Sequence, residues 1–464
     1  MTLHLYDTAT RSVRPFVPLV AGEVTLYHCG ATVQSAPHIG HLRGAGIVYD
    51  VLRRWLEWSG MHVTQVRNVT DIDDKILAKA AEAGRPWWAH AALNEQLFSD
   101  AYRALGCLSP TIEPRATGHI PQIVELIDEL IRTDAAYAAD GDVYFAVRSQ
   151  DDYGFLSGQK IDELSQGESG GKGKRDAADF TLWKAAKPGE PHWSSPWGPG
   201  RPGWHIECSA MARTYLGDTF DIHGGGLDLV FPHHENEAAQ SHGAGLPFAR
   251  HWMHSFWVTQ AGEKMSKSLG NTMTVEAITQ LVRAIELRYY LLSVHYRSSI
   301  EYSEGALQDA AKAFGRIEGL VRRVADRFGE VTIDEDLPAD FVTAMDDDLG
   351  VPRALAVVHD HVHAGNSALD GGDEEAAHAI ASSVRSMLAV LGLDPYDPAW
   401  QGGTAASETD AVLAALVEQL LQARRDARAG KDFARSDAIR DQLSAAGIVV
   451  EDGASGSTWT IGRS

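Results

Sequence analysis

Residues 24–41, VTLYHCGATVQSAPHIGH, join a short apolar run to a helical pattern through a polar loop. The apolar run has the length of a buried strand, and Cys29 stands where that strand would end. In a parallel α/β sheet, ligands bind at the carboxyl end of a strand, where the next helix points its positive end. His38 and His41 are therefore candidates for binding nucleotide phosphates, and the alternative is that they only decorate a helix start.

The segments that follow complete a strand–helix–strand unit. Residues 42–59 carry apolar side chains on one helical face, Gly60 is a typical residue to end that helix, and residues 62–69 read as a strand. We therefore predict an α/β fold with a Rossmann-type parallel sheet. Three aspartates in residues 68–84 open the next helix, where they either cap its N-terminus or face a substrate.

Composition limits the class of protein. The chain has 464 residues, enough for several domains with separate cores. Its three cysteines are too few for a disulfide framework, which favours a reducing cytoplasm, and its apolar windows are too short for a membrane helix. The net charge of -22 argues against non-specific DNA binding, whereas RNA binding needs only one locally basic face.

Four chelating side chains come from three separate predicted elements. Cys29 ends the first strand, Cys208 lies in the helical residues 201–217, and His233 and Glu237 stand four residues apart on one helical face. Two thiolates, an imidazole and a carboxylate suit the tetrahedral geometry of zinc. Taken singly, the thiols read as buried side chains and the other two as a surface pair, so their convergence is a hypothesis.

A lysine-rich segment follows a predicted strand in residues 251–258. Residues 262–271 read GEKMSKSLGN, with two lysines and two serines in a short loop. Compact cations of this kind can close over a triphosphate as negative charge builds during reaction. The alternative is a lysine loop that is only solvated. The histidine motif earlier in the chain favours phosphate binding over this alternative.

The C-terminal part reads as helical. The pattern after Val282 continues for more than a hundred residues and predicts a helix bundle, and residues 397–410 form a low-complexity joint. Beyond the joint, six basic residues face three acidic ones between positions 424 and 440, a composition that suits an RNA backbone or a solvated helix face. Trp459 is expected to be exposed on a terminal hairpin, where it can stack on an unpaired base or cover the helices. The basic residues are Arg424, Arg425, Arg428, Lys431, Arg435 and Arg440.

The motifs HIGH at 38–41 and KMSKS at 264–268 are the signatures of the class I aminoacyl-tRNA synthetases, which the chain resembles. Within that class it resembles the cysteinyl-tRNA synthetases, from about residue 20 to residue 460. The shared stretches are YHCG, NVTDIDDK, GWHIECSAM, DIHGGGLDLVFPHHENEAAQS, KMSKSLGN and KDFARSDAIRDQLSAAGI.

This resemblance implies an organisation and an activity. The activity is ATP-dependent ligation of L-cysteine to tRNA(Cys) through cysteinyl-adenylate, by a cytoplasmic monomer with no DNA or membrane partner. One zinc ion per chain would select the substrate thiolate, and Mg²⁺ would accompany ATP. The expected parts are residues 1–140 and 201–250 as two halves of the Rossmann catalytic domain, 141–200 as a loop-rich connective insertion, 251–305 as a stem-contact region with KMSKS, 306–396 as a helix bundle, and 397–464 as a linker with a small mixed tRNA (anticodon)-binding domain.

The resemblance also assigns roles to individual residues. The zinc ligands fall on Cys29, Cys208, His233 and Glu237, the set that the spacing suggests. The catalytic residues would be His38, His41, Lys264 and Lys267. ATP would be bound by these and by Gly40, Met265, Ser266 and Ser268. Cysteine would be bound by Cys29, Thr32, Trp204 and Asp228. The local excess of basic residues, and not the resemblance, proposes tRNA contacts, which would come from Arg424, Arg425, Arg428, Lys431, Arg435 and, in the hairpin, Trp459.

Two departures and three rival functions stay open on sequence alone. Ala31 stands where the family often has proline, and the C-terminal GASGSTWTI replaces a threonine-containing loop. The rivals are a cysteine ligase of mycothiol biosynthesis that acts on an amino-sugar inositol, a non-catalytic nucleotide-binding regulator and a zinc hydrolase. The basic C-terminal segment favours tRNA over the amino sugar, and the intact signature motifs disfavour a regulator. Four protein ligands leave no obvious place for the activated water of a hydrolase.

Overall fold

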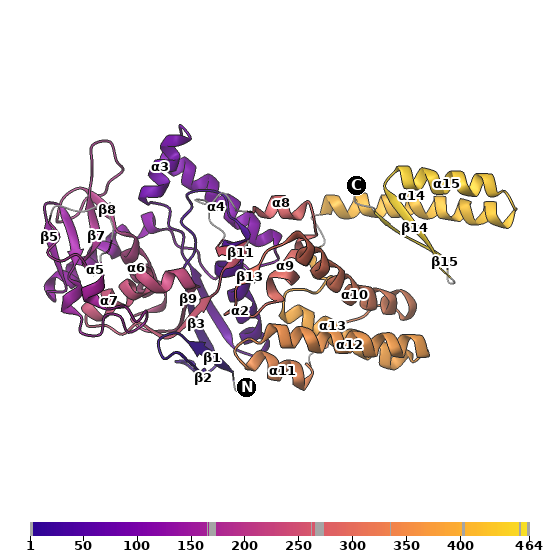
Figure 1. The fold of residues 1–464 in the computed structure, drawn as a ribbon, viewed down its shortest axis with the longest axis horizontal. Helices are drawn as coiled ribbons and strands as arrows, with labels where there is room; N and C mark the ends of the chain where they lie inside the picture. The colour runs from indigo at the N-terminus through magenta and orange to yellow at the C-terminus, as the bar shows by residue number, and fades with distance from the viewer. Residues whose placement is uncertain are drawn as a thin grey trace. The chain divides into compact units, whose positions relative to one another are not determined.

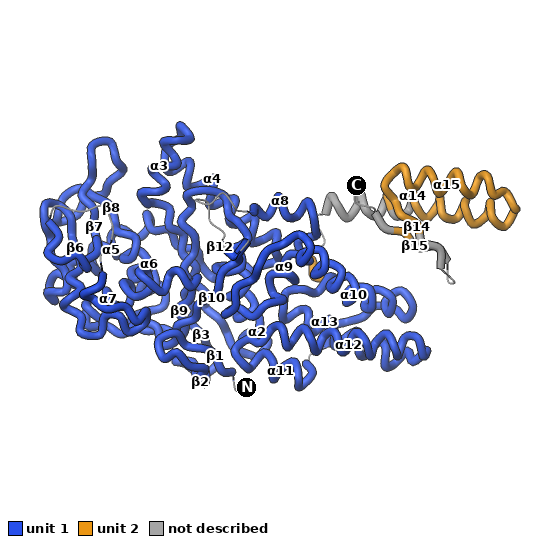
Figure 2. Tube along the Cα trace, viewed as in Figure 1, with its two compact units in different colours: residues 1–395 blue, residues 396–464 orange. Residues whose placement is uncertain are grey.

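The computed structural model describes residues 3–164, 166, 173–260, 262–264, 273–334, 336–400, 404–453 and 456–461. The chain forms two compact units, residues 1–395 and 396–464, which are coloured separately in Figure 2. Among the described residues, no helix combines the length and the apolar character needed to cross a membrane.

A parallel sheet of four strands lies at the centre of the first unit, in the order β10-β9-β3-β4. The chain leaves the sheet after β4 and returns at β9 on the other side of β3, so the strand order reverses between β3 and β9. Ligand crevices of open α/β sheets lie at such a reversal, outside the carboxyl ends of the strands. The predicted Rossmann-type sheet is confirmed. Its strands are β3 (Glu23–His28), β4 (His62–Arg67), β9 (Phe220–Gly226) and β10 (Ala249–Ser255).

The predicted strand–helix–strand unit joins β3 to β4. Its helix begins as α1 (Ile39–Leu42), passes through the π-helical turn η1 (Arg43–Ile47) and continues as α2 (Val48–Trp58). The apolar side chains that the pattern places on one face of the helix are all buried, namely Val48, Val51, Leu52, Trp55 and Leu56. Gly60 follows with a φ of 81°. Glycine reaches that left-handed conformation without a steric cost, which explains the end of the helix there.

The segment between β4 and β9 is more regular than the predicted loop-rich insertion. It contains an antiparallel sheet in the order β5-β6-β7-β8, which begins at Ala136. Residues 143–147 read as a strand-like piece in the sequence, and they overlap β6. The other strands are three to six residues long and are separated by turns, so a local reading of periodicity does not find them. In Figure 1 this sheet and helices α10 to α13 lie on opposite sides of the parallel sheet. The elements of the segment are α3 (Asp74–Glu82), α4 (Trp87–Ala104), η2 (Ala116–His119), α5 (Ile120–Arg132), β5 (Ala136–Ala139), β6 (Asp142–Phe145), η3 (Val147–Ser149), η4 (Ile161–Glu163), β7 (Phe180–Ala185), β8 (Gly200–Pro202) and α6 (Trp204–Leu216).

The remaining elements of the first unit flank the sheet or form the predicted helical region. The N-terminal hairpin is β1 (His4–Asp7) and β2 (Ser12–Pro15). Between β9 and β10 lie η5 (Leu227–Leu229), η6 (Val230–His234) and α7 (Glu235–Gly243). A second small sheet has the order β12-β11-β13. After β10 come β11 (Val258–Gln260), β12 (Glu263–Lys264), α8 (Val275–Thr279), α9 (Ala284–Leu292), β13 (Ile300–Glu301), α10 (Glu304–Phe328), α11 (Ala339–Asp346), α12 (Val351–Gly371) and α13 (Glu374–Val390).

The second unit is a helical hairpin with a β-hairpin, as the predicted small mixed domain requires. Its core consists of Val417, Leu421, Ile439, Leu443 and Ile448. The predicted joint is too long, because a helix already begins at Thr404 and continues through residues 411–421, which are rich in alanine and leucine and have high helix propensity. The finer division of the chain into six parts stays a prediction. The elements are η8 (Pro398–Trp400), α14 (Thr404–Ala429), α15 (Phe433–Ala445), β14 (Ile448–Gly453) and β15 (Gly456–Ile461).

A buried ion pair ties α2 to α9. Arg288 is fully buried, and its Nη2 lies 2.5 Å from Oδ2 of Asp50, which also accepts a 2.9 Å hydrogen bond from Arg54. Arg288 also donates to the carbonyl oxygens of Leu105 and Leu391. Burial by itself raises the pKa of Asp50, but the two guanidinium groups lower it below its ordinary value.

We expect Asp50→Asn to lower the free energy of unfolding by about 3–5 kcal/mol at pH 7, because it leaves the Arg288 charge buried without a counter-charge. Since folding lowers the pKa of Asp50, its contribution is complete above the unfolded value of about 4 and is lost as the pH falls through the folded value. Urea midpoints of wild type and variant, measured at decreasing pH, should therefore converge below about pH 4. A pH-independent difference would contradict this assignment.

Candidate active site

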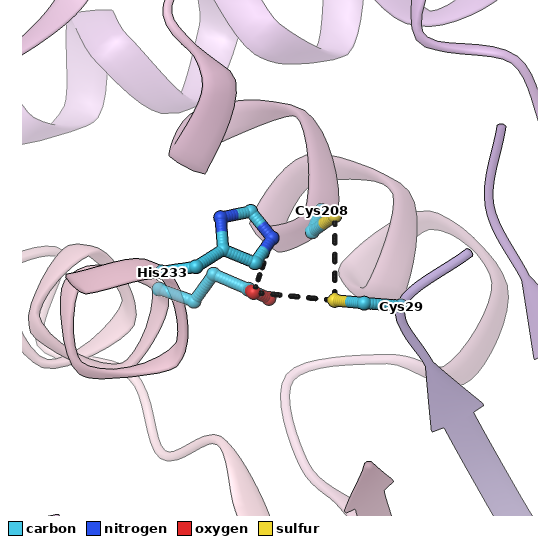
Figure 3. A group of neighbouring side chains, drawn as sticks. Cys29, Cys208 and His233 are labelled. Carbon is cyan, nitrogen blue, oxygen red and sulfur yellow. Dashed lines mark hydrogen bonds and ion pairs between the residues drawn. The ribbon is translucent and has the colours of Figure 1, made fainter. Parts of the chain in front are cut away.

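The four predicted metal ligands converge at one place in the first unit (Figure 3). The ligand atoms of Cys29, Cys208, His233 and Glu237 all lie within 4.8 Å of one another. The two sulfur atoms are 3.8 Å apart, and Oε1 of Glu237 lies 3.5 Å from Sγ of Cys29 and 3.0 Å from Nε2 of His233. Three elements supply them: the carboxyl end of β3, helix α6, and the turn η6 with α7.

The backbone after β3 is held closely against the neighbouring strands. Cys29 donates its amide hydrogen to the carbonyl of Gly224 at 2.9 Å, and Gly30 donates to Oδ1 of Asn68 at 2.8 Å. A Cβ atom on Gly30 would lie 1.8 Å from the carbonyl oxygen of Asn68, so only glycine fits beside that strand. These backbone contacts with the neighbouring strands hold Cys29 so that its thiol points into the cluster.

Burial makes this cluster a suitable place for a cation. The four side chains are each at most 3% exposed. Burial raises the pKa of both thiols and of Glu237, and lowers the pKa of His233. The anionic forms of three neighbouring ligands are therefore unfavourable unless a bound cation compensates them. The donor set of two sulfurs, one nitrogen and one oxygen is consistent with zinc.

Two further histidines, which we did not predict, touch the same cluster. His223 Nε2 lies 2.8 Å from Oε2 of Glu237, and His234 Nε2 lies 3.2 Å from Sγ of Cys29. Together with Cys29 and Glu237, they form a second group of possible metal ligands. His234 also contacts His254 through 2.8 Å between Nδ1 and Nε2, and burial lowers the pKa of His254 to about 3. The sequence signal was the position of His223 in the strand DIHGGG and the doubled histidine at 233–234.

The predicted cysteine-binding residues lie around the carboxyl ends of β3 and β9. The ring of Trp204 stacks on His233, with centroids 4.2 Å apart and an interplanar angle of 16°. Thr32 forms a bridge with Thr70, four residues after β3 ends. Asp228 is exposed, and its Oδ1 accepts a 3.2 Å hydrogen bond from Nε1 of Trp257. Of the three, Trp204 contacts a candidate metal ligand.

The departure at Ala31 leaves a backbone contact intact. The carbonyl of Ala31 accepts the amide hydrogen of Thr70 at 3.3 Å, and the amide of Val33 donates to the carbonyl of Thr70 at 3.2 Å. A proline at position 31 would have the same backbone carbonyl group. Alanine therefore preserves the hydrogen bond from Thr70 that the family's usual proline can accept.

The HIGH segment begins the helix after β3. His38 is buried at the N-cap position of α1, and its ring stacks on that of His41 with a centroid distance of 3.6 Å. The backbone amide of His38 donates to Nδ1 of His41 at 3.2 Å, so a neutral His41 carries its hydrogen on Nε2, where it can be donated. A Cβ atom on Gly40 would lie 3.0 Å from the His38 ring.

The KMSKS segment is described only at its first residue. The backbone of Lys264 belongs to β12, which pairs with β11 in antiparallel orientation. Met265, Ser266, Lys267 and Ser268 lie outside the described residues. The chain beyond that segment returns to the HIGH motif, where Ile39 donates its amide hydrogen to the carbonyl of Met273 at 3.2 Å.

The basic residues of the second unit do not all face solvent. Arg424 is only 3% exposed, because α14 places it on the same inward face as Val417 and Leu421. Arg425 is half-buried and pairs with Glu418 at 2.6 Å. The remaining three predicted contacts, Arg428, Lys431 and Arg435, are exposed. The expected exposure of Trp459 is wrong: it is half-buried against the core of the unit, in agreement with the covering role considered above.

Profiles of three families match successive parts of the chain. The tRNA synthetases class I (C) catalytic domain matches residues 15–312, the DALR domain residues 340–393, and the cysteinyl-tRNA ligase anticodon binding domain residues 410–459. The cysteine–tRNA ligases of Streptomyces avermitilis and Streptomyces griseus are 58% and 57% identical to the chain over 465 residues, which cover all of each protein. The chain belongs to the cysteinyl-tRNA synthetases.

Other relatives agree with this membership of the cysteinyl-tRNA synthetase family. The cysteine–tRNA ligase of Streptomyces coelicolor is 57% identical over the whole chain and 76% of its own length. The structure of Mycobacterium tuberculosis methionyl-tRNA synthetase in complex with methionyl-adenylate has a TM-score of 0.56 at 16% identity, and covers 83% of this chain and 92% of that one. A putative arginyl-tRNA synthetase from Campylobacter jejuni has a TM-score of 0.52 at 16% identity, with 80% and 93% covered. These two structures support the class I fold alone.

The family profiles also bear on the rival functions. The catalytic profile spans both signature motifs and all four candidate metal ligands of this cysteinyl-tRNA synthetase. The anticodon-binding profile covers the basic C-terminal segment. The alternative of an amino-sugar ligase is therefore not favoured.

Proposed function

We propose that this enzyme joins L-cysteine to tRNA(Cys) in two ATP-dependent stages, with cysteinyl-adenylate as the intermediate. The observation that carries the proposal is the buried cluster of two thiols, an imidazole and a carboxylate at the end of β3. The same strand-to-helix connection supplies His38 and His41. One crevice can therefore hold both a sulfur-containing substrate and a nucleotide.

Cys29, Cys208, His233 and Glu237 would hold one zinc ion. When bound, zinc supplies a position for the substrate sulfur and lowers the pKa of its thiol, whereas the hydroxyl of serine neither ionises nor coordinates comparably. His223 would orient the carboxylate of Glu237 through its 2.8 Å contact. We prefer this ligand set over the group with His223 and His234, because it contains both thiols.

The remaining predicted residues surround the amino acid. Trp204 packs its ring on His233 and would exclude water from one side of the pocket. Thr32 and Asp228, in the loops after β3 and β9, would contact the cysteine ammonium or the ribose of the adenylate. A directed interaction with the atom that distinguishes cysteine from serine can give enough discrimination without editing.

In the first stage, a carboxylate oxygen of cysteine attacks the α-phosphorus of ATP in line, and the bond to pyrophosphate breaks. His38 and His41 would donate hydrogen bonds to the phosphates, and Gly40 would let adenine approach the backbone. Lys264 and Lys267, with Met265, Ser266 and Ser268, would stabilise the charge on the five-coordinate phosphorus, and Mg²⁺ would accompany ATP. In the second stage, the 2′ hydroxyl of the terminal adenosine attacks the acyl carbon and AMP leaves.

Pyrophosphate exchange together with an acceptor comparison tests this function. The purified protein should exchange labelled pyrophosphate into ATP only when cysteine is present, and should contain about one zinc ion per chain. With cysteine and ATP it should then acylate tRNA(Cys). Equal exchange with serine would refute selection through sulfur. Transfer of cysteine to glucosaminyl-inositol instead of tRNA would establish the amino-sugar ligase.

The basic residues of the second unit that reach solvent would meet the tRNA backbone. We assign this role to the exposed Arg428, Lys431 and Arg435, and to Arg425, which is half-buried beside Glu418. Arg424 and Trp459, which the fold places against the core of the unit, would support that surface from within. Cytoplasmic location and a monomeric state remain predictions from the sequence.

We expect the double variant Lys431→Gln, Arg435→Gln to weaken tRNA binding and to lower its salt dependence. Each lost phosphate contact reduces the slope of log affinity against log salt by about 1, so the double variant should lose about 2. Binding measured between low and moderate salt checks this, with cysteine-dependent exchange unchanged. The matched control is Lys312→Gln with Arg322→Gln on the exposed face of α10. If the slope of log affinity against log salt is unchanged, Lys431 and Arg435 do not contact the tRNA backbone.

A further inference from the structure

Arg43 is a buried cation that the proposed mechanism does not use. It follows His41 by two residues, at the start of η1, and it is 1% exposed. Burying a charged side chain costs free energy unless hydrogen bonds satisfy it. The groups that accept hydrogen bonds from this guanidinium therefore offset the cost of burying its charge, and they hold it in place.

All the hydrogen bonds that the Nη atoms of Arg43 donate to the described chain end on backbone carbonyl oxygens. Nη1 donates to Phe256 at 3.0 Å, to Trp257 at 3.3 Å and to Ser298 at 2.9 Å. Nη2 donates to Val294 at 3.2 Å and to His295 at 3.0 Å. The planar guanidinium can reach two chain segments at once, whereas a lysine ammonium has three donors at one point.

The two clamped segments lead into the small sheet that carries Lys264. Residues 256–257 precede β11, and residues 294–298 precede β13. The segments also bond to each other, since Phe256 donates its amide hydrogen to Tyr296 at 2.7 Å. Strand β11 pairs with both β12 and β13. A side chain that fixes the segments before β11 and β13 therefore also fixes β12, the strand that contains Lys264.

Arg43 is joined just as directly to the HIGH motif. Helix α1 passes into η1 without a break, so the backbones of His41 and Arg43, two residues apart, belong to one continuous helix. A second connection runs from His38, which forms a bridge with Thr274. The chain on both sides of residues 265–272 is thus bonded to the segment of residues 38–43.

We propose that Arg43 is a positioning residue for adenylate formation, which sets the distance between the imidazoles of the HIGH motif and the β11–β12 strand pair. This inference rests on the proposed function, because both groups need a fixed separation only if they act on the same phosphates. Catalytic donors stabilise a transition state when they are placed beforehand, and a displacement of about 1 Å can cost roughly 100-fold in rate.

Arg43→Lys tests the proposal, with Arg288→Lys as the matched control. Arg288 is also fully buried and also donates to backbone carbonyls, but those belong to Leu105 and Leu391. Both variants should lower the melting temperature and keep their zinc content. Only Arg43→Lys should lower kcat of cysteine-dependent exchange, by about 10- to 100-fold, with KM for cysteine within about twofold of wild type.

A kcat for Arg43→Lys no lower than that of Arg288→Lys would overturn the inference, as would a loss confined to KM for cysteine. If Arg43→Lys does not fold, Glu301→Ala carries the test. Exposed Glu301 accepts hydrogen bonds from Thr259 and Gly262 in the same strand pair, so its loss should lower kcat about three- to tenfold and leave KM for cysteine unchanged. An unchanged kcat there would also overturn it. Failure of the wild type to exchange would instead refute the proposed function.

Discussion

Replacing Cys208 with serine is expected to remove the metal and to lower cysteine-dependent pyrophosphate exchange by more than about 100-fold, since even residues that only orient metal ligands cost up to that factor. The side chain is fully buried, and its sulfur lies 3.8 Å from that of Cys29. A serine hydroxyl fills nearly the same space, so the fold should persist. The hydroxyl does not ionise at neutral pH, and therefore it does not replace a thiolate ligand.

Two measurements make this expectation specific. Metal analysis of the purified variant should show loss of zinc, and circular dichroism should show an intact fold. The control is Cys107→Ser, which changes the third cysteine, 3.8 Å from Nη1 of Arg288 and not among the candidate ligands. It should retain zinc and exchange. Full exchange by a zinc-containing Cys208→Ser enzyme would refute the ligand assignment.

His41→Asn is expected to lower kcat of exchange by about 100- to 1000-fold, the usual cost of losing one donor to a transition-state oxyanion. Nδ1 of His41 accepts the amide hydrogen of His38, which leaves the hydrogen of the neutral ring on Nε2. The amide oxygen of asparagine can accept the same backbone hydrogen bond, so the helix start should persist. What the variant loses is the Nε2 donor to the phosphate.

Steady-state exchange kinetics separate this role from a structural one. KM for cysteine should stay within about twofold, because the lost interaction belongs to the transition state for phosphoryl chemistry. His242→Asn is the control, since His242 pairs with Asp152 at 3.0 Å at the protein surface. An effect on KM for cysteine alone would show that His41 shapes the amino acid pocket instead.

Several parts of the fold could be predicted because their signals are local. The strand–helix–strand unit around α2 follows from periodicity, and its predicted apolar face is buried in the structure. Of the antiparallel sheet β5–β8, only the strand-like residues 143–147, which overlap β6, could be recognised; the other short strands pair across turns and a stretch rich in glycine and lysine. The start of α14 at Thr404 was missed, because the threonines, serine and aspartate of residues 404–410 have the composition of a linker.

The candidate site divides in the same way. The residues Cys29, Cys208, His233 and Glu237 were named from their chemistry and spacing. His223 and His234 were not, since only the fold brings the histidine of DIHGGG beside Glu237 and the second histidine of the pair 233–234 beside Cys29. Arg424 was assigned to the RNA surface with its basic neighbours. Its helical phase relative to Val417 and Leu421 puts it inside.

By itself, the sequence determined the chemistry that this protein carries: the thiols and imidazoles, the two signature motifs, the parallel-sheet class and the basic C-terminal segment. Only the tertiary structure decided that Cys29 meets Cys208 and Glu237, which are 179 and 208 residues further along the chain, and that Arg43 donates to the carbonyl of Phe256 in the segment before β11. The physical reason is that periodicity and capping act over a few residues, whereas these contacts depend on strand order, with β9 returning beside β3.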